Sequence, residues 1–151
     1  MTRVGLDTNF LAYLAGVDRG GDDHLKVSAA RLMLARLKGK VSLVAPLQTL
    51  GELFTVLNRT GATRQDARAV TIQFHETFDA AAGASSTFMA ALDLAVAHKL
   101  QFWDALILSA AAEAGCSLLL SEDMPDGFVC CGLTVVNPFA ATSHAKLAAL
   151  P

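Results

Sequence analysis

Four carboxylates occupy positions from which a fold could bring them together. Asp7 and Asp123 each follow a short apolar run that is typical of a buried strand. Asp104 stands at the start of an apolar helical stretch, and Glu52 lies within another helical stretch. Taken singly, each acid is most simply a helix cap, a turn residue or a surface acid. Taken together, the four could form one cluster of oxygen ligands.

The chemistry of such a cluster follows from its charge. Carboxylates that are brought together repel, and one of them takes up a proton unless a cation compensates. Hard divalent cations are the usual compensation, and the lack of His and Cys partners at ligand spacing favours Mg²⁺ or Mn²⁺ over Zn²⁺. Such an ion activates water and stabilises the charge that develops on a phosphoryl group. The acids therefore predict a metal site at which this chemistry is possible.

The elements that would position these acids alternate between strands and helices. Expected strands cover residues 3–6, 41–45 and 117–120, with a break or short strand at 83–87 and one broken strand or a strand pair at 128–131 and 134–136. Expected helices cover 10–14, 24–38, 47–57, 88–98 and 103–114, with a further helix opened by a capping box at Thr63. This alternation predicts an α/β sandwich with a mainly parallel sheet. Ligands bind such sheets beyond the carboxyl ends of the strands, where Asp7 and Asp123 should share one edge.

Length and charge limit the organisation and the partners of the chain. The 151 residues fit one domain, taken as 1–138, followed by a tail over 139–151. A net charge of −2 argues against a protein that holds nucleic acid by bulk positive charge. However, residues 26–68 carry eight cations and two acids. This segment, including Arg31 and Arg36, forms either solvated helix faces or a surface for an anionic polymer.

The sequence shows no sign of a membrane or secretory address. The longest run without charged residues, 127–145, contains Asn137 and Pro138 and is interpreted as strand and loop. The first residues lack the cationic and apolar pattern of a signal peptide, so the expected location is the cytoplasm. The three cysteines lack metal-ligand spacing and are expected to be reduced thiols.

Four motifs in order resemble those of PIN-domain proteins, specifically VapC-type ribonuclease toxins. They are Leu6-Asp7-Thr8-Asn9, Leu50-Gly51-Glu52-Leu53, Trp103-Asp104-Ala105-Leu106-Ile107 and Leu118-Leu119-Leu120-Ser121-Glu122-Asp123-Met124. The resemblance covers nearly the whole chain and implies a three-layer α/β/α fold around a parallel sheet of about five strands. It also implies a metal-dependent endoribonuclease whose acidic set is Asp7, Glu52, Asp104 and Asp123.

The resemblance further implies partners and supporting residues. The family commonly forms homodimers and is neutralised by a small antitoxin, which covers the acidic cleft and alone would contact operator DNA. Many relatives carry a second acid two residues after the last Asp, where this chain has Pro125 and then Asp126. Glu122, Asp123 and Asp126 therefore stay open as the acid that faces the metal, with Asp123 favoured and Asp126 an outer candidate. Thr8, Asn9 and Ser121 are candidates to hold these carboxylates, or waters, by hydrogen bonds. Their alternative role is that of cap or turn residues.

The corresponding hypothesis is hydrolysis of an RNA phosphodiester by in-line attack of water that the ion activates. One alternative is a PIN-like domain that has lost catalysis and works through partners. Another is a phospho-accepting receiver domain, which needs an acidic pair at the first strand and a late Lys, whereas no Lys lies between Lys99 and Lys146. A dinucleotide-binding enzyme is set aside because no GxGxxG follows the first strand.

Overall fold

A six-stranded sheet lies at the centre of the computed structural model, which describes residues 1–151. Its strands are β1 (Arg3–Leu6), β2 (Ser42–Pro46), β3 (Asp79–Ala81), β4 (Leu118–Leu120), β5 (Val129–Cys130) and β6 (Leu133–Val136). Their order is β3-β2-β1-β4-β6-β5, and all pairs are parallel except β5 with β6. The predicted α/β sandwich with a mainly parallel sheet is confirmed, with six strands where about five were expected.

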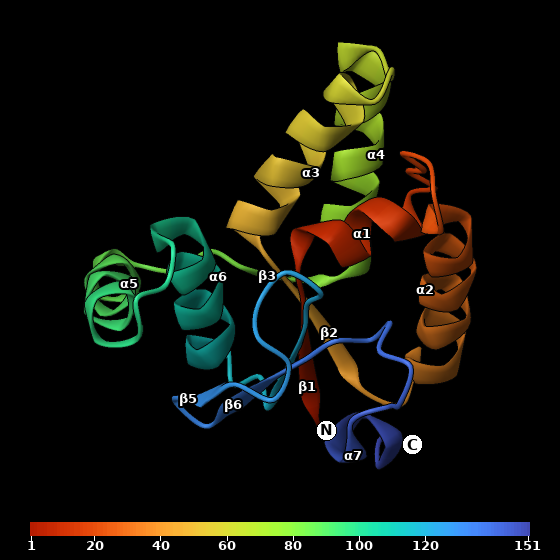
Figure 1. The fold of residues 1–151 in the computed structure, drawn as a ribbon. Coiled ribbons are helices and arrows are strands. Elements are labelled where there is room, and N and C mark those ends of the chain that lie inside the picture. The colour runs from red at the N-terminus through yellow and green to blue at the C-terminus, as the bar shows by residue number, and fades with distance from the viewer.

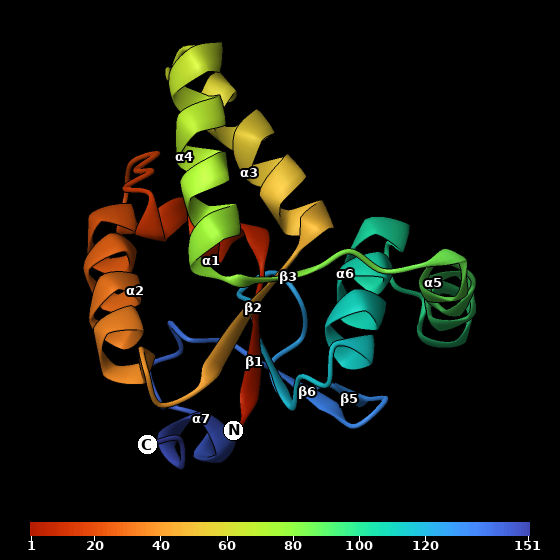
Figure 2. The same cartoon turned by 180° about the vertical axis from the view of Figure 1, so that it is seen from behind.

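The helices cover both faces of this sheet (Figures 1 and 2). They are α1 (Thr8–Leu14), α2 (Asp23–Leu37), α3 (Leu47–Arg59), α4 (Arg64–Thr77), α5 (Ser85–His98), α6 (Phe102–Glu113) and α7 (Ala145–Ala148). The larger core cluster joins one sheet face to α1, α2 and α3, and the smaller one joins the other face to α6. None of the helices is both long and apolar enough to cross a membrane.

The central strands are buried on both faces, which is why their sequences are almost wholly apolar. Val4, Leu6 and Leu120 are fully buried. Gly5 faces α6, and a Cβ at this position would lie 3.3 Å from the Cβ of Ala111. The lack of a side chain at Gly5 therefore lets α6 pack closely against β1, which fixes the position of α6 beside the carboxyl ends of the strands.

Residues 79–87 differ from the prediction. The strand is β3, at Asp79–Ala81, and residues 85–87 already belong to α5. Strand β3 pairs with β2, and Ser42 Oγ donates a hydrogen bond to Asp79 Oδ2 at 2.6 Å. Neither Asp nor Ala favours strands, so this edge strand forms through its pairing with β2 rather than through local preference.

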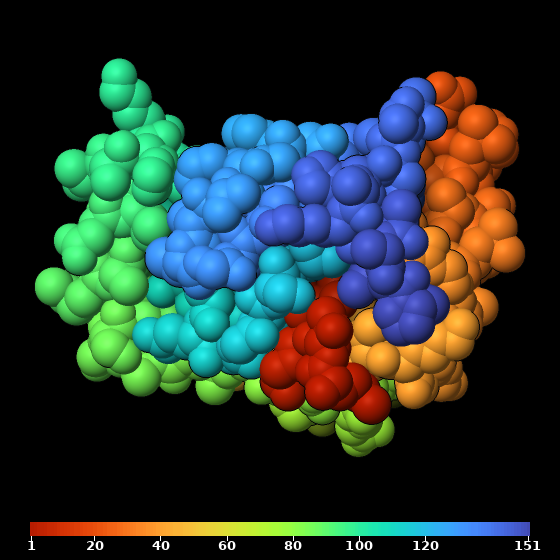
Figure 3. All heavy atoms as spheres, turned by 90° about the horizontal axis from the view of Figure 1, so that it is seen from below, coloured from red at the N-terminus to blue at the C-terminus, as the bar shows by residue number.

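The C-terminal tail packs back onto the domain. Leu147 of α7 is 2% exposed, and the Phe139 ring lies edge-on to Tyr13 with a centroid distance of 5.3 Å. Figures 1 and 3 show α7 and the C-terminus beside the N-terminus, from which β1 begins. Helix α7 thus closes the bottom of the sheet and leaves the other edge open.

Candidate functional site

Asp7 is the most deeply placed of the four acids. The register of β1 on β4 pairs Leu6 with Leu120, which sets Asp7 beside Ser121. Asp7 is 3% exposed; its Oδ1 accepts the Thr8 backbone N–H at 2.7 Å, and its Oδ2 accepts the Ser121 hydroxyl at 2.5 Å. The side chain thus caps α1 as well.

The environment of Asp7 disfavours its ionised form. Burial, and to a lesser extent the carboxylates of Asp123 and Asp104, raise the pKa of Asp7 to about 6. The hydrogen bonds from Ser121 and Thr8 oppose this shift but do not cancel it. A cation beside Asp7 would therefore stabilise its charge.

Glu52 is held from two sides in the middle of α3. Its Oε2 accepts the Thr8 hydroxyl at 2.5 Å, and its Oε1 accepts the Gln48 amide at 2.9 Å. Gln48 lies one helical turn before Glu52, so the two side chains share one face of α3. These contacts direct the Glu52 carboxylate toward the end of β1.

Asp123 and Asp104 complete the set. Asp123 Oδ2 accepts the Asn9 amide at 2.8 Å, and the Asp123 backbone N–H donates to Ser121 Oγ at 3.3 Å. Partial burial raises the pKa of Asp104, as do the charges of Asp123 and Glu52. The pKa of Asp123 is likewise raised by partial burial and by Glu122 and Glu52, while Arg19 and Lys26 lower it. The structure therefore brings Asp7, Glu52, Asp104 and Asp123 within electrostatic range of one another.

The fit of this set to a metal ion depends on donor chemistry and on spacing. The donors are all carboxylate oxygens, and none of the four acids forms an ion pair within the protein. Both properties suit Mg²⁺ or Mn²⁺. No three acidic, His or Cys side chains converge closely enough to hold a metal ion in this conformation.

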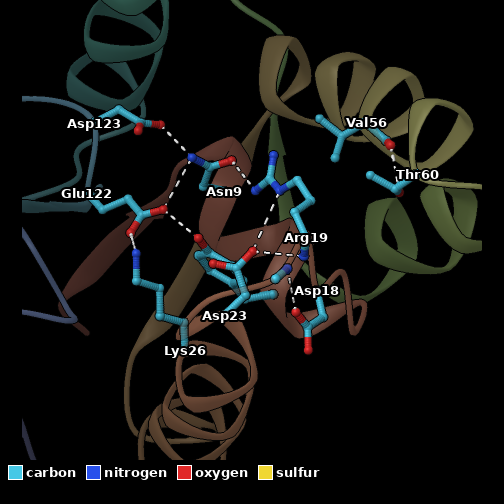
Figure 4. Close-up of polar contacts among 11 residues, drawn as sticks. Asn9, Asp18, Arg19, Asp23, Lys26, Val56, Thr60, Glu122 and Asp123 are labelled. Atoms are coloured by element: carbon cyan, nitrogen blue, oxygen red, sulfur yellow. Dashed lines mark hydrogen bonds and ion pairs between the residues drawn. The ribbon is translucent and has the colours of Figure 1, made fainter.

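Glu122 lies next to Asp123 in the chain but in a different environment (Figure 4). Its Oε1 accepts the Tyr13 hydroxyl at 2.7 Å, and its Oε2 pairs with Lys26 Nζ at 2.7 Å. We call Tyr13, Lys26 and Glu122 the Glu122 clamp. The clamp ties the loop after β4 to α1 and α2. Burial, followed by the hydrogen bond and charge of Glu122, raises the pKa of Tyr13 to about 12, so its hydroxyl stays a donor.

Asn9 links the clamp to the acidic set, as Figure 4 shows. Its amide N–H₂ group donates to Asp123 and, at 3.3 Å, to Glu122 Oε1. The Arg19 guanidinium donates to Asn9 Oδ1 at 3.2 Å and lies 3.8 Å from Asp23. Arg19 thus orients the amide so that its donors face the two acids.

A cleft of about 1030 Å³ lies between α3 and α6, next to the acidic set. Its floor includes Thr8, Asn9 and Asp123. Polar residues of one face of α3 form one wall, namely Gln48, Glu52, Thr55 and Arg59. The opposite wall is the α6 face that carries Trp103, Leu106 and Ala110.

Other candidates lie away from this cleft. Asp126 is exposed, and its Oδ1 accepts the Asn137 backbone N–H at 2.8 Å. Arg36 donates to the backbone oxygen of Leu147 at 2.8 Å, at the closed end of the sheet. Arg31 does not line the cleft either.

The cations that the structure places at the site are Arg19, Lys26 and Arg59, which the motifs did not single out. Arg59 follows Glu52 by seven residues, a spacing that indicates the same helix face and could have found it. Arg19 pairs locally with Asp23, but its contact with Asn9 and the contact of Lys26 with Glu122 join residues 10 and 96 positions apart, for which the local sequence holds no comparable signal.

The fold and the acidic edge together define a class of protein. Residues 4–124 match the PIN domain, and the chain therefore belongs to the PIN-domain family. No curated protein sequence matches the chain.

Several solved structures share this fold. Mycobacterium tuberculosis VapC20, described as a sarcin-ricin loop cleaving toxin, is 22% identical, with 77% of this chain and 86% of that chain covered and a TM-score of 0.60. A toxin–antitoxin complex from Klebsiella pneumoniae gives 20% identity, coverage of 90% and 98%, and a TM-score of 0.64. VapBC2 from Rickettsia felis, bound to a promoter DNA fragment, is 14% identical, with 89% of this chain and 97% of that chain covered and a TM-score of 0.63. The chain thus shares its fold with VapC toxins and toxin–antitoxin complexes.

Proposed function

We propose that the protein is a divalent-metal-dependent endoribonuclease and the toxin of a toxin–antitoxin pair. The observation that carries the proposal is a set of four acids, none of them ion-paired, that lie within electrostatic range of one another, two of which, Glu52 and Asp123, line one cleft. The adjacent Glu122 does have an internal cation, so the fold can supply one and does not supply it to these four. Acids arranged in this way are suited to a cation from outside the protein.

The acids have distinct roles in this proposal. Asp7, Asp104 and Asp123 would hold Mg²⁺ or Mn²⁺, with Glu52 beside them. When bound, such an ion activates water and offsets the negative charge that develops on a phosphodiester. Ser121 keeps the Asp7 carboxylate in place through its hydroxyl. Asn9 does the same for Asp123.

Glu52 would orient the water that attacks phosphorus. Thr8 and Gln48 each donate to one of its oxygens, and each carboxylate oxygen retains a further acceptor site. Arg59, farther along the same wall, would contact a phosphate of the RNA strand. We propose Arg59 for the phosphate contact in place of the expected Arg31 and Arg36, because Arg59 lines the cleft and those two do not.

The proposal includes partners and location. The structural neighbours include toxin–antitoxin complexes, which supports a small antitoxin that covers this cleft. Contact with operator DNA would come through that antitoxin. We further propose a homodimer that acts on RNA in the cytoplasm.

A cleavage assay tests the activity. We expect the purified protein to cut single-stranded RNA with Mg²⁺ or Mn²⁺ and to stop in excess EDTA. Asp7→Asn should abolish cleavage, because the amide cannot supply the charge that the ion needs. Asp93→Asn, an exposed acid on α5, is the matched control and should keep full activity. Undiminished cleavage in EDTA, or by Asp7→Asn, would overturn the proposal and favour an inactive PIN-like binding domain.

A further inference from the structure

The two walls of the cleft differ in chemistry. The α3 wall presents the polar side chains of one helix face and ends at Arg59, with Leu47 and Val56 beside them, whereas the α6 wall carries Trp103, Leu106 and Ala110. These three residues follow a spacing of three and four, so they share one face of α6. A ligand that fits both walls has a charged side and an apolar side.

Trp103 is the prominent feature of the apolar wall. It is the only tryptophan of the chain and is 51% exposed. Its ring packs against Phe102 with a centroid distance of 4.9 Å and an interplanar angle of 74°. Phe102 packs in turn against Phe88 at 5.5 Å. The indole is therefore supported on one side and open on another.

The cleft beside Trp103 has room for a flat group. Its lining includes the small residues Gly51, Ala82, Gly83 and Ala84. At Gly51, on the facing wall, no heavy atom lies within 4 Å of the place where a Cβ would be. The space across from the indole is therefore open at the level of Glu52.

We propose that Trp103 is a stacking platform for one nucleobase of a single-stranded RNA. This inference rests on the proposed function, which sets the phosphates along the acids and Arg59. A nucleotide so placed can turn its base toward the α6 wall. Stacking on an aromatic ring accepts every base, because each has a π-face, and it requires a base that is not paired in a duplex. The subsite thus selects single strands without selecting a sequence.

The neighbouring apolar surface offers a different explanation of the exposed indole. Helix α5 exposes Met89 by 58% and Val96 by 83%, and these side chains do not line the cleft. If Trp103 belonged with them, it would contact a protein partner. Its place in the cleft wall favours the nucleobase.

The lone tryptophan allows a direct test by intrinsic fluorescence. The wild-type protein in excess EDTA is titrated with a short single-stranded oligoribonucleotide that carries an anisotropy label. We expect the indole emission to change and to saturate at the same RNA concentration as the anisotropy. A perfect RNA duplex should leave the emission unchanged.

Variants give the second arm of the test. Trp103→Ala should weaken RNA binding roughly tenfold, and Trp103→Phe should recover most of the loss because a ring remains. In the Mg²⁺-supported reaction the loss should appear in KM more than in kcat. Met89→Ala, an exposed apolar residue outside the cleft, is the matched control and should bind RNA as the wild type does.

The outcomes separate this inference from the proposed function. RNA binding without a change in emission, together with unchanged affinity of Trp103→Ala, would overturn the subsite. A change in the sedimenting mass of Trp103→Ala with unchanged RNA affinity would assign the indole to a protein interface and overturn it too. Matched emission and anisotropy curves without any cleavage in Mg²⁺ would support the subsite and contradict the nuclease.

Discussion

Glu122 and Asp123 are neighbours in the chain but belong to two regions with opposite electrostatics. In the Glu122 clamp, the carboxylate has a lysine and a tyrosine hydroxyl within 2.7 Å. In the cleft, Asp123 has the Asn9 amide as its side-chain donor and no ion pair. The charge of Glu122 in the clamp is therefore paired with a cation of the protein, and the charge of Asp123 in the cleft is not.

This contrast shows how the fold separates stability from chemistry. A carboxylate that is paired and hydrogen-bonded holds two elements together, and here Glu122 joins the loop after β4 to α1 and α2. The unpaired acids raise one another's pKa, which is unfavourable unless an ion binds. The clamp holds the loop in place, so the cleft can keep its acids close to one another.

The strongest way to break the comparison is to neutralise each of the two neighbours in turn. Asp123→Asn should lower kcat/KM by roughly a thousandfold, since it removes an expected metal ligand. Glu122→Gln should keep activity within about tenfold, as expected for a residue that acts through others. A steady-state RNA cleavage assay with both variants measures this difference.

Stability should show the reverse order. Glu122→Gln leaves Lys26 without its carboxylate and should lower the free energy of unfolding by about 1–2 kcal/mol in a urea titration at neutral pH. Asp123→Asn removes a repelling charge and should not destabilise the protein. Equal losses of activity in the two variants, or equal losses of stability, would show that the two regions are not distinct.

Asp7 provides a second way to sharpen the comparison, through pH. Its pKa rises from 3.8 to about 6 on folding, so between these values the folded state binds more protons than the unfolded state. Without metal, this group therefore makes stability fall as pH rises from about 4 through 6. Asp7→Asn removes the effect and should be more stable than the wild type at pH 7 by about 2 kcal/mol, allowing for the weaker hydrogen bonding of the amide.

Thermal unfolding in EDTA across this pH range measures the effect, and divalent ions provide its control. Mn²⁺ should raise the Tm of the wild type at pH 7, because an ion that binds only the folded state stabilises it. The same ion should leave the Tm of Asp7→Asn unchanged. If the Tm of the wild type and the Tm of Asp7→Asn depended on pH in the same way, burial of the Asp7 charge would not be what lowers stability.

The sequence was sufficient to predict the fold class and the edge at which the acids meet. Apolar runs between helices predict a parallel sheet, and a parallel sheet sets the ends of β1 and β4 together, as the pairing of Leu6 with Leu120 shows. Strand β3 was misplaced, because its formation depends on pairing with β2 rather than on its own residues.

The environment of individual charges was not predictable to the same extent. Glu122, Asp123 and Asp126 look alike in the sequence. In the structure, Lys26 pairs with Glu122 and the Asn137 backbone N–H donates to Asp126, whereas Asp123 has neither contact. These contacts arise from tertiary packing. For the same reason, the basic segment indicated an anion-binding surface without showing that Arg36 faces the C-terminal backbone.

The smallest expected effect concerns Gly51, which lies in the interior of α3 on the cleft wall. Glycine in a helix interior costs roughly 0.5–1 kcal/mol relative to alanine, and a Cβ at Gly51 would meet no atom within 4 Å. Gly51→Ala should therefore raise the free energy of unfolding by about that amount in a urea titration.

The same change should weaken RNA binding slightly, because the new methyl group projects into the cleft. Gly61→Ala is the matched control beyond the end of α3, where φ is +107° and alanine is strained, so it should destabilise the protein. If Gly51→Ala also destabilised the protein, the glycine would serve packing rather than the opening of the cleft. If Gly51→Ala instead gains stability and loses RNA affinity, the glycine lowers stability in order to keep the cleft open. The clamp residues, by contrast, raise stability.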